Sequence, residues 1–181
     1  MRIVAGKYKG RVLSEFDLPN TRPTSDMLRE SLFNILYSVE DSIFLDLFAG
    51  TGAVAFEAVS RGAKEAYLVE HNINSYKVIV KNAQTLKAEN VKIIRSDFKD
   101  ALLSFKKQGI VFDFVFLDPP YKSELAEETL VLLKDYGLLN DSSVVVWEHE
   151  KFKESVTVEG YDIIKFKKYG DKCFKVMQLS A

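Results

Sequence analysis

The sequence predicts an α/β fold with a mostly parallel sheet, and two features of the chain support that prediction. Short apolar segments end near Phe48, Glu70, Arg95 and Asp118, at intervals of 22 to 25 residues. Each interval leaves room for a helix, and parallel neighbours need a connection of about a dozen residues or more, usually helical. The body of the chain is therefore predicted to consist of successive βαβ units with right-handed crossovers.

The predicted strands are apolar on both sides, as expected for strands covered by helices on both faces of a sheet. Four of them read IFLDLF (43–48), AYLVE (66–70), VKIIR (91–95) and FDFVFLD (112–118). A helix near 123–135 leads to a fifth strand at 143–147. The tail then alternates apolar and polar residues around Gly170 and Asp171, which predicts an antiparallel hairpin.

The N-terminal segment has a different pattern. Residues 2–13 contain four basic and no acidic side chains, and Gly6 and Gly10 divide them into short apolar pieces, which predicts a basic hairpin. A helix follows, with Thr24 as its N-cap and an end near Val39. Its buried face is predicted to comprise Leu28, Leu32, Ile35, Leu36 and Val39, with Arg29 and Phe33 on the other side.

Length and composition limit the class of protein. The 181 residues predict one domain, or one domain with a small appendage, and 47% apolar with 28% charged residues excludes a largely disordered chain. Cys173 has no second cysteine to pair with, and His71 and His149 show no zinc-ligand spacing, so we expect no metal site. The start of the chain resembles no secretory signal and no apolar stretch could span a membrane, which predicts a cytoplasmic protein.

Charge is balanced in total but uneven along the chain. The net charge of −1 gives no bulk attraction for nucleic acid. Residues 1–11, however, hold four basic groups and no acid, and residues 160–175 hold five lysines against two aspartates. Any binding of nucleic acid is therefore predicted to depend on local basic segments. We expect residues 1–40 to form the basic hairpin and helix, packed on a main domain at 41–181.

A glycine-rich turn follows the first predicted strand. Ligands of open parallel sheets bind beyond the carboxyl ends of the strands. In DLFAGTG (46–52), Gly50 and Gly52 allow a tight turn and a close approach of a ligand to a helix N-terminus. Glu70 lies twenty residues after Gly50, the spacing of a ribose-binding acid in dinucleotide sites. A tight turn without a ligand is the alternative interpretation.

Two more acidic residues end the next strands. Glu70 can accept hydrogen bonds from two ribose hydroxyls, and the alternative is a solvated strand end. Asp97 can accept from the exocyclic amine of adenine while Phe98 covers the ring, and the alternative is a helix cap. Asp46, Glu70 and Asp97 at three successive strand ends together favour a nucleoside-containing ligand.

A rigid loop, Asp118-Pro119-Pro120-Tyr121, follows the fourth predicted strand. Two prolines there can neither continue the strand ladder nor enter a helix interior, so they fix the loop. The Asp118 carboxylate and the Pro119 carbonyl can then face one NH₂ group, with the Tyr121 ring as a stacking surface. Such a pocket suits a planar base that carries an amine and has left its stack. A rigid loop with a helix cap is the alternative.

These motifs carry a family resemblance. DLFAGTG, Glu70, Asp97 and DPPY, in this order, resemble the class I S-adenosylmethionine-dependent methyltransferases that methylate exocyclic amines. RIVAGKYKGRVL (2–13) and RPTSDMLRESLFNIL (22–36) further resemble the bacterial family that methylates guanine N2 in 16S rRNA. The resemblance implies a Rossmann-like seven-stranded sheet with an antiparallel C-terminal hairpin and S-adenosylmethionine as cofactor. It also implies one guanine of 16S rRNA, in the small ribosomal subunit or its assembly intermediate, as acceptor.

The same resemblance assigns roles to particular residues. The methionine part of the cofactor would be lined by Asp46, Ala49, Gly50 and Gly52, the ribose held by Glu70, and the adenine by Asp97 and Phe98. The target base would be held by the catalytic residues Asp118, Pro119 and Tyr121. RNA contacts are predicted at Arg2, Lys7, Lys9, Arg11, Arg22 and Arg29, while Met27 stands where the family usually has a basic residue. We expect direct methyl transfer without a covalent enzyme intermediate.

Other functions fit parts of the pattern. An amine-binding loop of this kind also suits DNA adenine, large-subunit rRNA or protein glutamine as acceptor. A nicotinamide-dependent oxidoreductase would use the same glycine-rich turn, but it would leave the loop at 118–121 without a role. A non-catalytic RNA-binding module would explain only the basic arm.

Overall fold

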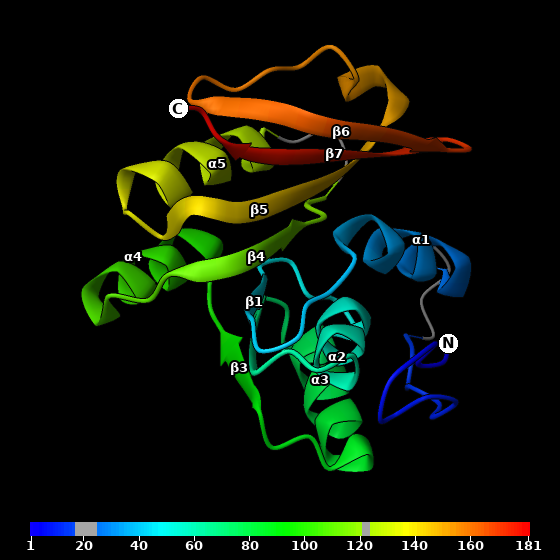
Figure 1. Ribbon diagram of the computed structural model, residues 1–181. Coiled ribbons are helices and arrows are strands. Elements are labelled where there is room, and N and C mark those ends of the chain that lie inside the picture. The colour runs from blue at the N-terminus through cyan, green and yellow to red at the C-terminus, as the bar shows by residue number, and fades with distance from the viewer. Residues whose placement is uncertain (17–24, 121–123) are drawn as a thin grey trace.

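A computed structural model describes residues 1–16, 25–120 and 124–181, and these form a seven-stranded sheet in the order β3-β2-β1-β4-β5-β7-β6 (Figure 1). The pairs β1–β2, β2–β3, β1–β4 and β4–β5 are parallel, whereas β7 is antiparallel to both β5 and β6. This confirms the predicted α/β class, the mostly parallel sheet and the antiparallel C-terminal hairpin, whose two-residue turn is Gly170-Asp171.

The elements follow one another along the chain as predicted. The helices are α1 (Asp26–Leu36), α2 (Ala53–Ser60), α3 (Ile73–Leu86), α4 (Phe98–Gln108) and α5 (Leu125–Asp135), with a short 3₁₀ helix η1 (Lys151–Lys153). The strands are β1 (Ile43–Asp46), β2 (Glu65–Glu70), β3 (Val91–Arg95), β4 (Phe112–Leu117), β5 (Leu139–Glu150), β6 (Tyr161–Tyr169) and β7 (Lys172–Leu179). None of the helices in the described ranges is long and apolar enough to cross a membrane.

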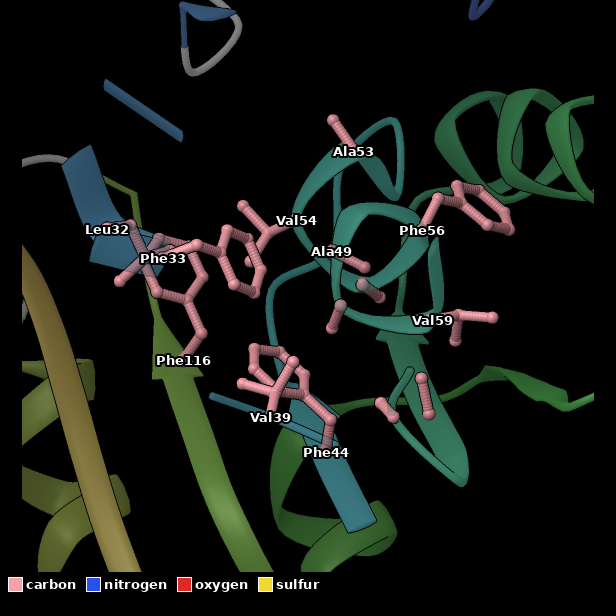
Figure 2. Packing of buried hydrophobic residues seen from close by; sticks show 14 of the residues in the cluster. Leu32, Phe33, Val39, Phe44, Ala49, Ala53, Val54, Phe56, Val59 and Phe116 are labelled. Atoms are coloured by element: carbon pink, nitrogen blue, oxygen red, sulfur yellow. The ribbon is translucent and has the colours of Figure 1, made fainter. Parts of the chain in front are cut away.

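Two apolar clusters fill the two faces of the sheet, with α1, α2 and α3 over one face and α4 and α5 over the other (Figure 1). Consecutive strand residues alternate between them: Phe116 belongs to the first cluster and Leu117 to the second. Figure 2 shows side chains from α1, β1, α2 and β4 gathered in the first cluster. The central strands are therefore apolar on both sides, as the sequence indicates.

Several predicted boundaries shift in the structure. Helix α1 is capped by Ser25, whose hydroxyl accepts from the N–H of Leu28 at 3.2 Å, rather than by Thr24, which lies outside the described residues. The helix ends at Leu36 because Tyr37 has a positive φ of 61°, and Val39 enters the core from the following loop. Strand β1 stops at Asp46, where the glycine-rich turn begins, two residues before the predicted end. Strand β5 is longer than predicted at both ends.

The N-terminal arm forms the predicted hairpin. Arg2 and Val12 make an antiparallel bridge, and the N–H of Ile3 donates to the carbonyl of Arg11 at 3.0 Å. The arm is fixed to α2 by Glu57, whose two carboxylate oxygens accept from the N–H groups of Val4 and Ala5, each at 2.9 Å. A side chain that sequence analysis left without a role thus holds the arm in place.

Arg29 corrects a prediction. Its side chain is fully buried, with Nη2 at 2.8 Å from Oδ1 of Asp26 and Nε at 3.7 Å from Oε2 of Glu57, and it also donates to the carbonyl of Arg2. Phe33 is buried as well. Arg29 therefore joins α1, α2 and the arm inside the protein, and it does not face an RNA ligand. Burying a charge of this kind requires such partners.

The arm offers a matched test at two glycines that share a φ of +82°. A Cβ at Gly6 would lie 1.8 Å from the carbonyl oxygen of Ser60, whereas a Cβ at Gly10 would meet nothing within 4 Å. Gly10→Ala should cost about 1–2 kcal/mol of folding free energy through backbone strain alone. Gly6→Ala should cost at least about 1–3 kcal/mol more, because the arm must move away from α2.

Urea unfolding measures both free energies, and limited proteolysis reports whether the arm has detached. Equal destabilisation by Gly6→Ala and Gly10→Ala, with an equally protected arm, would contradict this account.

Candidate active site

A cavity of about 660 Å³ opens at the carboxyl ends of the central strands. Its wall comprises the turn after β1, the end of β2, the start of α4 and the loop after β4. This volume lies in the range of small-molecule and cofactor sites. The fold therefore brings together at one edge of the sheet the segments that the sequence singled out.

Asp46 at the end of β1 and Ala49 and Gly50 in the turn that follows all line the cavity. Gly52 is not among the residues that line it. Gly52 has a φ of +80°, and a Cβ there would lie 2.6 Å from the ring of Phe56. Glycine is needed at 52 for the left-handed turn and for packing against Phe56 of α2.

Glu70 ends β2 and stabilises the turn. Its Oε2 accepts from the N–H of Gly50 and its Oε1 from the N–H of Asn72, both at 2.9 Å. The carboxylate is nearly buried and lines the cavity. Each oxygen has a second lone pair, so Glu70 can hold the turn and still accept from a ligand hydroxyl.

Asp97 and Phe98 lie at the start of α4, where both line the cavity. Oδ1 of Asp97 accepts from the N–H of Lys99 at 2.8 Å, so this residue is the N-cap of the helix. Phe98 is buried against Phe48, with the ring centroids 5.7 Å apart. One oxygen of Asp97 therefore caps the helix, as the alternative interpretation of this residue proposed. The rings of Phe48 and Phe98 form an aromatic wall beside Asp97.

The loop after β4 places Asp118 and Pro119 in the wall of the same cavity, whereas Tyr121 lies outside the described residues. Asp118 directly follows Leu117, the last residue of β4, and Pro119 and Pro120 come next. Asp118 lies two residues after Phe116, so the two side chains share the face covered by α1 and α2.

Glu148 is a site residue that sequence analysis missed. The pairing of Leu117 with Trp147 brings the next residues, Asp118 and Glu148, alongside each other. Glu148 is 3% exposed and its Oε1 lies 3.0 Å from Nζ of Lys172. The sequence could have indicated Glu148, because it is an acidic residue directly after the apolar run at 144–147.

Burial sets the protonation of these carboxyls. The pKa of Asp46 is raised to about 7: desolvation raises it most, a backbone hydrogen bond from Ala55 lowers it, and the negative charges of Glu70 and Glu148 raise it. Desolvation and the neighbouring Glu148 hold the pKa of Asp118 well above its usual range, while Lys172 lowers it. Burial likewise raises the pKa of Glu148 against the lowering effect of Lys172.

Comparison with known proteins identifies the family. The family model described as "Conserved hypothetical protein 95" matches residues 1–178. The chain belongs to this family. Among curated members, "Ribosomal RNA small subunit methyltransferase D" of Escherichia coli K12 is 37% identical over 100% of this chain and 91% of its own length. The Haemophilus influenzae protein of the same name is 36% identical over 98% and 93%.

A solved structure of this family supports the fold. The "Putative methyltransferase yhhF from Escherichia coli" superposes with a TM-score of 0.88 at 34% identity, over 100% of this chain and 98% of that one. The class I methyltransferase fold implied by the sequence motifs is therefore confirmed for this family member.

The predicted RNA contacts are placed unevenly. Arg2, Lys7, Lys9 and Arg11 are exposed on the arm, and Nη2 of Arg11 donates to the carbonyl of Thr85 at 2.7 Å. Arg22 lies outside the described residues, Arg29 is buried, and Met27 is exposed. The arm continues into Glu15 and Phe16, which line the cavity. No pattern in the sequence marked those two residues.

The lysines of the C-terminal hairpin differ in accessibility. Lys175 is fully buried and donates to the carbonyls of Lys153 and Val156. Lys172 pairs with Glu148, and Lys168 pairs with Glu154 at 2.8 Å. Lys165 and Lys167, like the buried Lys175, meet no carboxylate among the ion pairs of the described residues.

Asp46→Asn tests the cost of a buried charge. The pKa of Asp46 is about 7 in the folded protein and about 4 in the unfolded chain. Between pH 4 and pH 7 the folded protein therefore keeps a proton that the unfolded chain loses, and the free energy of unfolding falls as the pH rises. Asp46→Asn should remove that cost and gain about 2–4 kcal/mol of unfolding free energy at pH 8, with little change at pH 4.

Urea unfolding at the two pH values measures the difference, and Asp100→Asn in the exposed first turn of α4 is the control. A gain that is the same at both pH values would contradict the assignment.

Proposed function

We propose that this protein is an S-adenosylmethionine-dependent methyltransferase that methylates N2 of one guanine in 16S rRNA, on the small ribosomal subunit or its assembly intermediate. One observation supports this most directly. A single cavity joins the turn closed by Glu70 to the loop of Asp118 and Pro119, so a methyl donor and a target amine can meet there.

The residues of the cavity fit the cofactor. Glu70 offers carboxylate lone pairs for ribose hydroxyls, and Phe98 with Asp97 offers an aromatic face beside an acceptor for adenine. The buried Asp46 carboxylate suits the positively charged methionine part. When bound, S-adenosylmethionine supplies an electrophilic methyl group on a positive sulfur atom, which needs no covalent help from the protein.

The acceptor side of the cavity suits an exocyclic amine. The Asp118 carboxylate and the Pro119 carbonyl can each accept one N–H of the same NH₂ group, and the two prolines limit the movement of these acceptors. Hydrogen bonds to both protons direct the nitrogen lone pair of guanine away from the ring and toward the methyl group. The protein's main contribution is alignment of the two reactants.

A proton must leave the amine once the new N–C bond has formed. The carboxylate of Asp118 is within reach of that proton in this arrangement, and its raised pKa makes it a better base than an exposed aspartate. Asp118 therefore orients the amine first and accepts the proton afterwards, unless water takes it.

The names of the relatives support the choice of acceptor. Two proteins of this family that match nearly the whole chain are named as small-subunit rRNA methyltransferases. In this proposal residues 1–40 provide RNA recognition, through Arg2, Lys7, Lys9 and Arg11 on the exposed arm, and residues 41–181 provide the methyltransferase domain. The cytoplasm, where ribosomal subunits are assembled in bacteria, is the proposed location.

Asp118→Ala should abolish methyl transfer while leaving cofactor affinity within about threefold, because it removes an acceptor for the amine and leaves the turn of Glu70 intact. The assay is transfer of a tritiated methyl group to small subunits from cells that lack this protein, with nucleoside analysis of the product. Asp100→Ala, an exposed carboxylate in α4, is the matched control. N6-methyladenine as product, or saturable binding of NAD in place of S-adenosylmethionine, would overturn the proposal.

The pH profile of the reaction tests the pairing of Asp118 with Glu148. The rate should fall as pH drops through the pKa of Asp118, because the protonated carboxyl loses an acceptor position. Glu148→Gln removes a negative neighbour and should move this acid limb to lower pH. Lys172→Met removes a positive neighbour and should move it to higher pH. Shifts in the same direction, or no shift in either variant, would contradict the assignment.

A further inference from the structure

Tyr37 occupies a strained turn at the end of α1. Its φ and ψ are 61° and −71°, and the N–H of Ser38 donates to the carbonyl of Leu36 at 2.8 Å. These values define the rare form of the γ-turn, which is unfavourable for a residue with a side chain. Glycine would adopt the same backbone without that cost, so a tyrosine here needs a reason outside the turn itself.

The Tyr37 side chain is almost entirely exposed, at 87%, and contributes little to the core. Nζ of Lys165, from the middle of β6, lies 5.4 Å from the centre of its ring. A cation beside an open aromatic face is a common element of proteins that bind single-stranded nucleic acid, where bases stack on the ring and lysines meet the phosphates.

The neighbouring strand positions extend this surface. Lys165 pairs with Val176 and Lys167 with Phe174, and both of these partners belong to the apolar cluster under α1. Lys165 and Lys167 are therefore on the same face of the sheet as Tyr37. Lys167 is exposed, and neither lysine meets a carboxylate among the described ion pairs.

The surface lies close to the acceptor loop on the same face. One row of strand residues runs across the sheet from Lys165 through Val176 and Val146 to Phe116, two residues before Asp118. Three strand spacings correspond to about 14 Å, and two residues along β4 add about 7 Å in the perpendicular direction. The backbone of Lys165, whose side chain reaches Tyr37, is thus roughly 16 Å from the backbone of Asp118, a distance that a few nucleotides can span.

We propose that Tyr37 and Lys165 form a stacking platform for an unpaired base of the substrate RNA, a few nucleotides away from the methylated one. The proposal rests on the proposed function, because it takes RNA as the substrate. The platform binds without reading sequence: the ring stacks on a base, and Lys165 and Lys167 meet the phosphates on either side. An RNA partner is favoured over a protein partner because both flanking side chains are cationic.

Three substitutions of Tyr37 separate binding from folding. Tyr37→Ala and Tyr37→Gly should weaken the binding of a fluorescent single-stranded RNA about five- to tenfold, whereas Tyr37→Phe should stay within twofold of wild type. Tyr37→Gly should also raise the melting temperature, because the turn is then unstrained. Increased stability together with weaker RNA binding is a combination that a purely structural tyrosine would not give.

Lys165→Gln should weaken RNA binding and reduce its salt dependence. Its matched control is Lys106→Gln, because Nζ of Lys106 lies 4.6 Å from the ring of Tyr136 on the opposite face of the sheet. In methyl transfer to small subunits, Tyr37→Gly should raise KM and leave kcat within twofold, since no group near Asp118 has changed.

The outcomes distinguish the platform from the proposed function. If wild-type protein does not methylate small subunits, the proposed function fails, while the oligonucleotide assay still decides on the platform. Wild-type RNA affinity in Tyr37→Gly would overturn the platform. It would also be overturned if Tyr37→Gly raised KM on intact subunits but left the affinity for protein-free RNA unchanged, because Tyr37 would then contact a ribosomal protein.

Discussion

The burial of negative charge at the carboxyl edge of the sheet is the constraint on which the site depends. Asp46, Asp118 and Glu148 come from three adjacent strands or their ends, and burial raises the pKa of each. Such an arrangement costs folding free energy when the groups ionise. It is useful only if something positive or rich in N–H groups enters the cavity. A sulfonium cofactor and an amine-bearing base provide these two features, so the buried carboxyls that cost folding free energy when ionised are also the groups suited to methyl transfer.

The surrounding structure limits that cost and positions the site. Glu70 is satisfied by two backbone N–H groups, and Lys172 lies beside Glu148. On the other side of α2, the buried Glu57 holds the arm and meets Arg29 and Arg61. The arm reaches the cavity at Glu15 and Phe16, where Asn82 accepts from the N–H of Ser14 and donates to the carbonyl of Thr51. The element proposed to recognise RNA is thus connected to the site of chemistry by buried polar contacts, which are stronger than exposed ones.

Much of the fold and the core of the site could be predicted from sequence, because both depend on local patterns. Regular strand spacing predicted the parallel sheet, and its geometry then required the motifs at 46–52, 70, 97–98 and 118–119 to lie at one edge. The packing role of Gly52 could not be predicted, because its contact with Phe56 depends on the position of α2. Arg29 was assigned to the surface because it falls outside the apolar stripe of its helix. Its buried partner Glu57 is distant in sequence, and no local pattern reveals it.

The central claim is that a buried carboxylate beside the cofactor favours the positive charge of the methyl donor. The most direct measurement compares the calorimetric affinities of S-adenosylmethionine and S-adenosylhomocysteine at pH 6 and pH 8, since the two ligands differ by the charged sulfonium. Because the pKa of Asp46 is about 7, the preference for S-adenosylmethionine should increase between these values as the carboxyl ionises. A preference that stays constant, or that falls with rising pH, would contradict the account.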